Sequence, residues 1–293
     1  MPLLSLCSTN YNTEPVTRRS LESVLRQVRG FDYEIVIVDS ESDDGSYEAL
    51  LSLRDSAPLV LERRRCSRGV GRNLAFERSR GEYVVTFDLD TLYNEDWGRL
   101  LRWVLRNHIT FGLSAVLSQF YPRGALEAVG GWRDFQYWED VDLWARLAAK
   151  GLYRTYPMVC GENLKRTPGR NRIAKAGRLY ARCRDKVATT DWIPFGLYWR
   201  GYRAFLQRSG KARHAYHFAV FLAAYLPGLR KRARMYPTLG LRPSILVDRS
   251  FSLDLGLVPP ESLAPSLTSY DTYEGCESAL DRGDLGFLPG TYD

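Results

Sequence analysis

Two carboxylates one residue apart, Asp88 and Asp90, follow a β-branched and aromatic run over residues 83–87. The run predicts a short buried strand. Because strand side chains alternate between faces, both carboxylates are expected on one side at its carboxyl end, the edge where open α/β sheets bind ligands. Two hard oxygen ligands there suit Mg(II) or Mn(II), which would bridge to a diphosphate. Taken alone, the pair also fits a strand followed by a solvated acidic turn.

A third carboxylate, Asp39, ends the buried strand predicted over residues 33–38. At a strand end it can accept hydrogen bonds from a nucleotide base or a ribose hydroxyl. A polar turn after the first predicted strand precedes a helix, so its backbone N–H groups could face a nucleotide. The residues of that turn are Thr9, Asn10, Tyr11 and Asn12.

Three further polar residues complete the set. Arg72 could pair with a phosphate or a base, or form an ion pair with Asp39 or Asp88, while Asn73 could hold the loop. Asp140 opens a predicted helix and is the candidate general base. Carboxylates in a first helical turn also stabilise an ordinary helix N-terminus, which is the structural alternative for Asp140.

The elements that must position these residues alternate between strand and helix up to about residue 165. Strands are expected over residues 3–8, 33–38, 59–63 and 83–87, and helices over 15–28, 46–53 and 70–80, with Thr13 as the N-cap of the first helix. Alternation of this kind predicts βαβ units and an α/β fold with a mostly parallel sheet.

The pattern changes beyond that point, and three regions are expected: 1–165, 166–235 and 236–293. The second interleaves Arg with aromatic residues and predicts amphipathic helices, with a break at Pro227-Gly228. The third is rich in Pro, Gly, Ser and acid, and is expected to be partly irregular.

Charge is segregated along the chain. Residues 150–235 carry 20 Lys and Arg against three acidic residues, whereas residues 1–149 carry 18 against 22 and residues 236–293 carry three against nine. Such a basic block indicates an anionic partner, and its aromatic residues favour an anionic membrane surface, although a solvated basic face is the alternative.

Other global features indicate the compartment. The longest apolar stretch, residues 218–226, is much shorter than the roughly 20 residues of a membrane span. The five Cys are scattered and lack metal-ligand spacing. No signal peptide is apparent, and a cytoplasmic location is expected, peripheral to the inner face of the membrane.

Four segments in order resemble the family-2 glycosyltransferases, which have the GT-A fold. They are residues 8–12, residues 37–46, residues 68–73 with 81–90, and the Gly-Gly-Trp of 130–132 with the Trp-Glu-Asp of 138–140. The resemblance covers about residues 3–165. It implies a Rossmann-like, mostly parallel sheet flanked by helices, followed here by a mainly helical C-terminal region.

The resemblance also implies an activity and roles for residues. The expected enzyme is a metal-dependent, inverting glycosyltransferase that moves a sugar from a nucleotide-sugar, usually a UDP-sugar, to a glycan or lipid-linked acceptor. Asp90 would hold Mn(II) or Mg(II), with Asp88 nearer the ribose, Asp140 would be the base, and Glu139 would support the acceptor. The implied donor site comprises Thr9, Asn10, Tyr11, Asn12, Asp39, Arg68, Gly69, Arg72, Asn73, Asp88 and Leu89. A further metal ligand stays open.

Three alternatives remain at this point. A nucleotidyltransferase acting on sugar phosphates would usually have a Gly-rich basic loop after its first strand, and residues 6–12 contain neither Gly nor a basic residue. A nucleic-acid-binding module could use the basic block, but no such motif occurs and no nucleic acid is expected as a partner. A scaffold without enzymatic activity is the third alternative, and the presence of Asp39, Asp88, Asp90 and Asp140 argues against it.

Overall fold

A computed structural model describes residues 3–54, 57–164, 172–189, 193–208, 211–235 and 250–256, together with residues 277, 280, 281 and 288. Its strands are β1 (Leu4–Asn10), β2 (Tyr33–Asp39), β3 (Leu59–Arg63), β4 (Tyr83–Thr86), β5 (Thr91–Tyr93), β6 (Gly112–Val116), β7 (Ser118–Pro122), β8 (Tyr153–Val159) and β9 (Gly161–Asn163). Its helices are α1 (Thr17–Gln27), α2 (Ser46–Leu51), α3 (Arg68–Arg78), α4 (Glu95–Arg106), α5 (Arg123–Val129), α6 (Glu139–Ala149), α7 (Arg172–Thr189), α8 (Phe195–Arg208), α9 (Lys211–Met235) and α10 (Phe251–Leu255).

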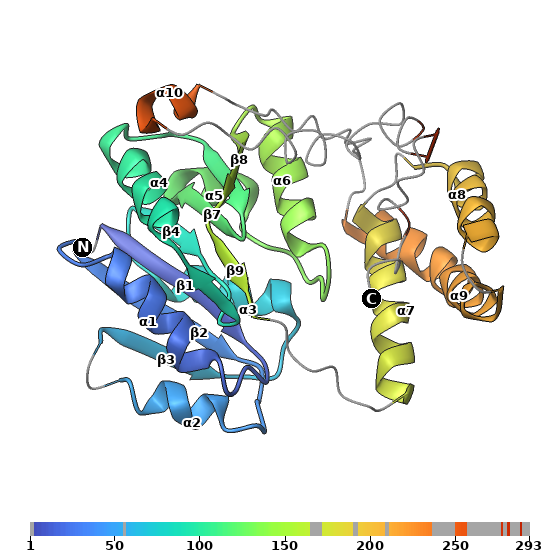
Figure 1. The fold of residues 1–293 in the computed structure, drawn as a ribbon, viewed down its shortest axis with the longest axis horizontal. Helices are drawn as coiled ribbons and strands as arrows, with labels where there is room; N and C mark the ends of the chain where they lie inside the picture. Colours follow the sequence, from blue (N-terminus) through green and yellow to red (C-terminus); the bar gives the residue numbers. More distant parts are fainter. Residues whose placement is uncertain are drawn as a thin grey trace.

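The main sheet has seven strands in the order β3-β2-β1-β4-β7-β6-β8 (Figure 1). Only β7 runs antiparallel to its neighbours, so the sheet is mostly parallel, as predicted. The strands β1, β2 and β4 therefore end at one edge, where Asn10 and Asp39 lie opposite each other in register. A separate pair, β5 and β9, crosses beside this edge.

The sheet is buried on both faces. Strand residues alternate between a cluster that includes Leu6, Ile37 and Val85 and one that includes Val36 and Val84. The helices α1, α2 and α4 contribute to the first cluster, and α3, α5 and α6 to the second. Burial of both faces explains why β2 reads as a continuous apolar run rather than an alternating one.

Three local expectations are corrected. Thr13 does not cap α1: its hydroxyl bonds to Asn10 and Thr17, and Val16 occupies the cap position without a side-chain hydrogen bond. The helix α3 begins at Arg68, two residues before the predicted start, because the Ser67 hydroxyl accepts from Val70 N and caps it. The strand β4 ends at Thr86, before the two aspartates.

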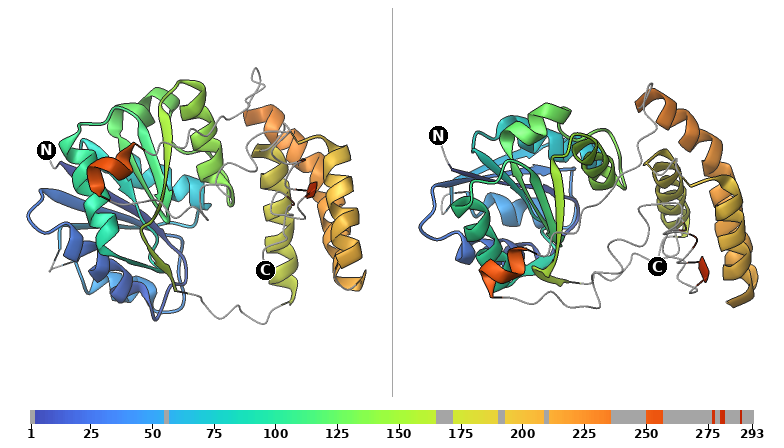
Figure 2. Two further views of the ribbon diagram at one scale, coloured as in Figure 1. Left: turned by 45° about the horizontal axis from the view of Figure 1, so that its top comes forward. Right: turned by 90° about the horizontal axis from the view of Figure 1, so that it is seen from above.

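The helices α7, α8 and α9 pack around their own apolar cluster beside the sheet, on the side of α6 (Figures 1 and 2). The expected break at Pro227-Gly228 is wrong, because α9 continues through both residues to Met235. Its backbone there lies so close to α7 that a Cβ on Gly228 would be 2.8 Å from Arg184 O, and this packing supports the helix across the proline. Among the described residues, no helix is long and apolar enough to cross a membrane.

The short helix α10 returns to the sheet, next to α4 (Figure 1). Its Phe251 is buried against Trp103, Phe111 and Tyr156, at centroid distances of 4.1, 6.4 and 5.5 Å. A segment of the expected irregular tail is thus part of the sheet's core, while most of residues 236–293 lie outside the described part of the chain.

Candidate active site

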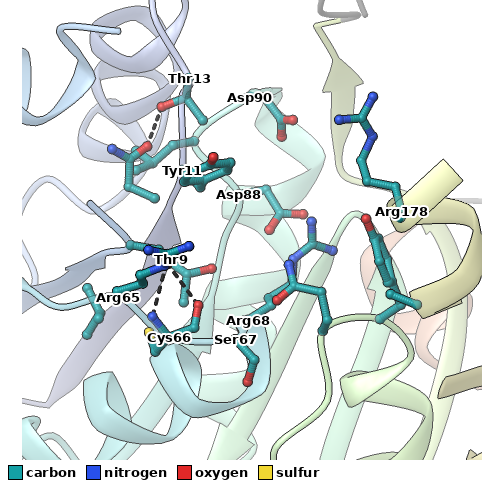
Figure 3. A pocket seen from close by; sticks show the side chains of 18 of the residues that line it. Thr9, Tyr11, Thr13, Arg65, Cys66, Ser67, Arg68, Asp88, Asp90 and Arg178 are labelled. Carbon is teal, nitrogen blue, oxygen red and sulfur yellow. Dashed lines mark hydrogen bonds between the residues drawn. The ribbon is translucent and has the colours of Figure 1, made fainter. Parts of the chain in front are cut away.

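A cavity of about 670 Å³ opens at the carboxyl edge of β1, β2 and β4 (Figure 3). The rest of its wall includes the loops before α3 and α6, the turn after β4, the strand β9 and the helix α7. Of the predicted site residues, those lining the cavity are Thr9, Asn10, Tyr11, Arg68, Asp88, Leu89 and Asp90. The remaining ones, Asn12, Asp39, Gly69, Arg72, Asn73, Glu139 and Asp140, lie behind or beside the wall.

Asp88 and Asp90 both face the cavity, but a turn rather than strand alternation directs them there. Asp88 N donates to Tyr93 Oη at 2.8 Å, and Ser20 Oγ donates to the Asp88 carbonyl at 3.0 Å. Between the two aspartates, the buried Leu89 side chain anchors the turn in the core. Asn163 Nδ2, from β9, donates to Asp90 Oδ1 at 3.3 Å.

Asp39 is fully buried rather than open to the cavity. Its carboxylate accepts from Asn10 Nδ2 at 2.7 Å and from the hydroxyl and N–H of Ser42 at 2.6 and 3.0 Å. The neighbouring Val38 and Ser40 line the cavity instead. The observed contacts of Asp39 therefore join the ends of β1 and β2, and its role as a nucleotide ligand stays a prediction.

Arg72 is a buried cation surrounded by three carboxylates. Its guanidinium donates to Asp88 at 3.2 Å and to Asp140, and lies 3.6 Å from Glu139. Burial alone would lower the pKa of Arg72, but the combined charges of Asp140, Glu139 and Asp88 raise it above its usual value. The ion pair expected with Asp88 is present, whereas the alternative partner Asp39 belongs to the separate network with Asn10 and Ser42.

The two carboxylates that open α6 differ in environment. Glu139 is buried, and burial followed by the charge of Asp140 raises its pKa, while Arg72 and Arg68 oppose the rise. Asp140 is partly exposed and accepts from Trp132 Nε1 at 3.1 Å as well as from Arg72. Asp140 is therefore linked through one guanidinium to Asp88 at the cavity wall.

Gly69 and Asn73 contact the backbone of neighbouring segments, and their roles as nucleotide-sugar ligands stay predictions. Gly69 N donates to Phe135 O at 2.9 Å, and a Cβ at this position would lie 2.0 Å from Arg133 O, so only glycine permits this approach. Asn73 Oδ1 accepts from Trp132 N at 3.0 Å, which fulfils the expectation that Asn73 holds a loop. Both contacts position the segment leading into α6.

Among the cavity residues that the sequence prediction missed are Arg65, Gln136, Tyr137, Asn163 and Arg178. Arg178 belongs to α7, beyond the predicted boundary at residue 165, and lies opposite Asp88 in Figure 3. The helix is fastened to the cavity wall by the buried Asp185, which accepts from the N–H groups of Gln136 and Tyr137 at 2.9 and 3.2 Å. The interleaved Arg and aromatic residues of α7 were a signal, but they did not indicate which face turns to the cavity.

The donor set of the cavity fits a hard divalent cation. In the part of the chain that the structure describes, no three His, Cys, Asp or Glu side chains form a metal cage. Asp88 and Asp90 are the two carboxylates of the described cavity wall. Mg(II) is commonly held by one or two carboxylates together with phosphate oxygens and water, and Mn(II) takes similar oxygen ligands. Two carboxylates are therefore enough protein ligands for either cation.

Comparison with known proteins identifies the sheet region. The family described as "Glycosyl transferase family 2" matches residues 5–137. The poly(ribitol-phosphate) beta-glucosyltransferase of Bacillus spizizenii is 33% identical over 105 residues, which are 34% of this chain and 16% of that protein. The UDP-Glc:alpha-D-GlcNAc-diphosphoundecaprenol beta-1,3-glucosyltransferase WfaP of Escherichia coli is 29% identical over 91 residues, 31% of this chain and 36% of that protein. This chain thus spans well under half of either relative.

A solved structure extends the likeness to nearly the whole chain. The mannosyltransferase PcManGT from Pyrobaculum calidifontis, solved with GDP-Man and Mn2+, superimposes with a TM-score of 0.52 at 19% identity, covering 98% of this chain and 85% of that one. At this identity the likeness concerns the fold. Residues 5–137 therefore belong to glycosyltransferase family 2, within a chain that has the GT-A fold.

Proposed function

We propose that this chain is an inverting, metal-dependent glycosyltransferase. It transfers a sugar from a nucleotide-sugar, a UDP-sugar in our assignment, to a hydroxyl of a glycan or lipid-linked acceptor. The assignment extends the family membership of residues 5–137 to the activity of the whole chain.

One observation carries the proposal: a single cavity presents two carboxylates and three arginines. Asp88 and Asp90 share its wall with Arg65, Arg68 and Arg178. Carboxylates alone would repel a diphosphate, and arginines alone would not hold a metal. Together they suit a metal–diphosphate, because the carboxylates would hold the cation and the guanidinium groups would pair with phosphate charge.

The leaving group and the nucleophile then have separate partners. When bound by Asp88 and Asp90, the cation supplies Lewis-acid stabilisation of the departing nucleoside diphosphate. Asp140 takes the proton of the acceptor hydroxyl as its oxygen attacks the anomeric carbon opposite the diphosphate. Arg72 and Trp132 hold Asp140 in the observed orientation.

The nature of the acceptor is suggested by the names of two relatives. One acts on poly(ribitol-phosphate) and the other on a sugar-diphosphoundecaprenol. Both acceptors carry phosphate and a glycan or polyol hydroxyl. We assign the same broad class of acceptor to this chain.

An apolar face on α8 and α9 supports a peripheral membrane location. Of nine large hydrophobic side chains exposed in the described part of the chain, five lie on these two helices: Phe195, Trp199, Tyr216, Leu222 and Leu226. Leu226 is 63% exposed. Exposed Trp, Phe and Leu beside Arg is the composition of interfacial helices, which dock on anionic bilayers without spanning them.

The metal assignment predicts the effect of Asp90→Asn. The variant should lose Mn(II)-dependent binding of the nucleoside diphosphate, because a neutral amide replaces a charged ligand of a hard cation. Asp88→Asn should weaken binding less, since Asp88 Oδ1 already pairs with Arg72. Calorimetric titration with UDP and Mn(II), repeated in EDTA, measures both effects. The control is Asp96→Asn, which changes a partly exposed carboxylate of α4 that is not among the described cavity residues. UDP binding that is unaffected by EDTA and by Asp90→Asn would refute the metal site.

The base assignment predicts a separate change in turnover. With a hydroxyl acceptor, Asp140→Asn should lower kcat about 10²–10⁴-fold, the usual contribution of a general base. The Kd for the donor should hardly change, because Asp140 lies outside the donor cavity wall. Steady-state kinetics measures the change in kcat. The control is Glu127→Gln, which makes the same carboxylate-to-amide change at an exposed position on α5. Near-normal turnover of Asp140→Asn together with loss in Glu139→Gln would move the role to Glu139.

The membrane assignment predicts the outcome of liposome flotation. The protein should float with vesicles that contain anionic lipid and stay unbound with neutral vesicles. Replacing Leu222 and Leu226 by Ser should abolish flotation, whereas Leu51→Ser, which changes an equally apolar exposed residue on α2, should not. Equal recovery of the wild-type protein in the unbound fraction for both kinds of vesicle contradicts the assignment.

A further inference from the structure

A second cavity, of about 600 Å³, lies where α7 and α9 meet the loops before α3 and α6. Its basic lining residues are Arg184, Arg230, Lys231 and Arg234, and Asp134 is the one acidic residue of the described lining. The remaining lining residues are Ser67, Gln136 and Pro227. The basic residues of this cavity have no role in the transfer reaction proposed above.

Two of the cations are fixed in place. Arg184 Nε donates to Asp185 Oδ1 at 2.8 Å, and Lys231 Nζ donates to the same oxygen at 3.1 Å. Lys231 Nζ also lies 4.2 Å from the centre of the Phe135 ring. Because Asp185 is buried and holds the wall of the first cavity through Gln136, these cations are positioned by the same carboxylate that shapes the donor site.

The other two cations are available to a ligand. Arg230 and Arg234 lie one turn apart on α9, and both are exposed. Neither makes a hydrogen bond or an ion pair with a residue of the described chain. Guanidinium groups at this spacing suit phosphate oxygens, which they can bind through paired N–H donors.

Within the described part of the chain, acidic side chains do not balance the cations of this cavity. Four cations face Asp134 and the shared Asp185, and Asp134 Oδ1 already accepts from Ser67 Oγ at 2.6 Å. The excess positive charge of two matches the charge of one phosphate or diphosphate group. A neutral glycan would not neutralise this excess positive charge.

The two cavities adjoin. Ser67 and Gln136 line both of them, so a molecule whose anionic group lies in the second cavity can extend past these residues into the first. The first cavity is where the donor's anomeric carbon would lie in the proposed reaction. An acceptor anchored in this way would present a hydroxyl beside its phosphate to the donor.

We propose that this basic cavity binds the phosphate or diphosphate group of the acceptor, an inference that rests on the proposed transferase function for the identity of the ligand. The anion is held by Arg230 and Arg234, with Arg184 and Lys231 behind them. The cavity thereby selects acceptors that carry a phosphate close to the accepting hydroxyl.

Anion binding can be measured apart from donor binding. The probes are inorganic pyrophosphate, geranyl diphosphate and a glycerol-phosphate oligomer, titrated calorimetrically in EDTA so that metal bridging at Asp88 and Asp90 is removed. Changing Arg230 and Arg234 together to Ala should weaken binding about tenfold or more, because two charge-assisted contacts are lost. The matched control changes Arg102 and Arg106 to Ala, which removes two exposed arginines with the same spacing from α4.

The probes distinguish the possible sources of the phosphate. Tighter binding of geranyl diphosphate supports a lipid-linked diphosphate acceptor, and tighter binding of the oligomer supports a phosphate-containing polymer. Binding of inorganic pyrophosphate alone overturns the assignment to an acceptor. Unchanged affinity of the Arg230/Arg234 variant for all three probes overturns the site itself.

Kinetics separates this inference from the proposed function. In transfer to the better-bound acceptor class, the Arg230/Arg234 variant should show a KM for the acceptor raised about tenfold, with kcat and the donor KM unchanged. An unaltered acceptor KM contradicts the inference and leaves the transferase standing. Arginine-dependent probe binding in a protein that binds no nucleotide-sugar would instead refute the transferase and keep the anion site.

Discussion

The candidate site depends on the ion pairs that the buried guanidinium of Arg72 makes with three carboxylates. This guanidinium joins Asp88 at the cavity wall to Glu139 and Asp140 at the start of α6, segments about 50 residues apart in the chain. Removing one partner of a buried ion pair typically costs about 3–5 kcal/mol, because a desolvated charge loses its counter-charge. The cluster therefore links the turn after β4 to the start of α6, which are the donor side and the acceptor side in the proposed reaction. The positive charge of Arg72 also offsets the repulsion among the three carboxylates that surround it.

Much of the sheet region could be predicted because its signals are local. The strand over residues 59–63 has the predicted bounds, and the buried run of 33–38 extends by only one residue, to Asp39. The second follows from an unbroken apolar run, residues 35–38, in a strand that is buried on two faces. Asp88 and Asp90 were also found correctly as cavity residues, although a turn anchored by Leu89, rather than strand alternation, directs them.

What could not be predicted depends on contacts between distant segments. Sequence spacing placed Asp39 at a strand end, but its partners are Asn10 at the end of β1 and Ser42 in the turn that follows β2. Likewise, the basic pattern of α7 indicated an amphipathic helix, while the docking of Asp185 onto the loop before α6 decides that Arg178 enters the cavity. The continuity of α9 through Pro227 is similar, since packing on α7 outweighs the local preference for a break.

The central claim is that the cavity at the carboxyl edge of the sheet binds a nucleotide-sugar through a divalent cation. The most direct test is a thermal-shift screen of UDP-, GDP- and dTDP-sugars, each with Mn(II) and in EDTA. We expect one nucleotide class, the UDP-sugars, to raise the Tm with Mn(II) and to have no effect in EDTA, because ligands that bind only the native state stabilise it. A Tm that no nucleotide-sugar raises under either condition would contradict the account.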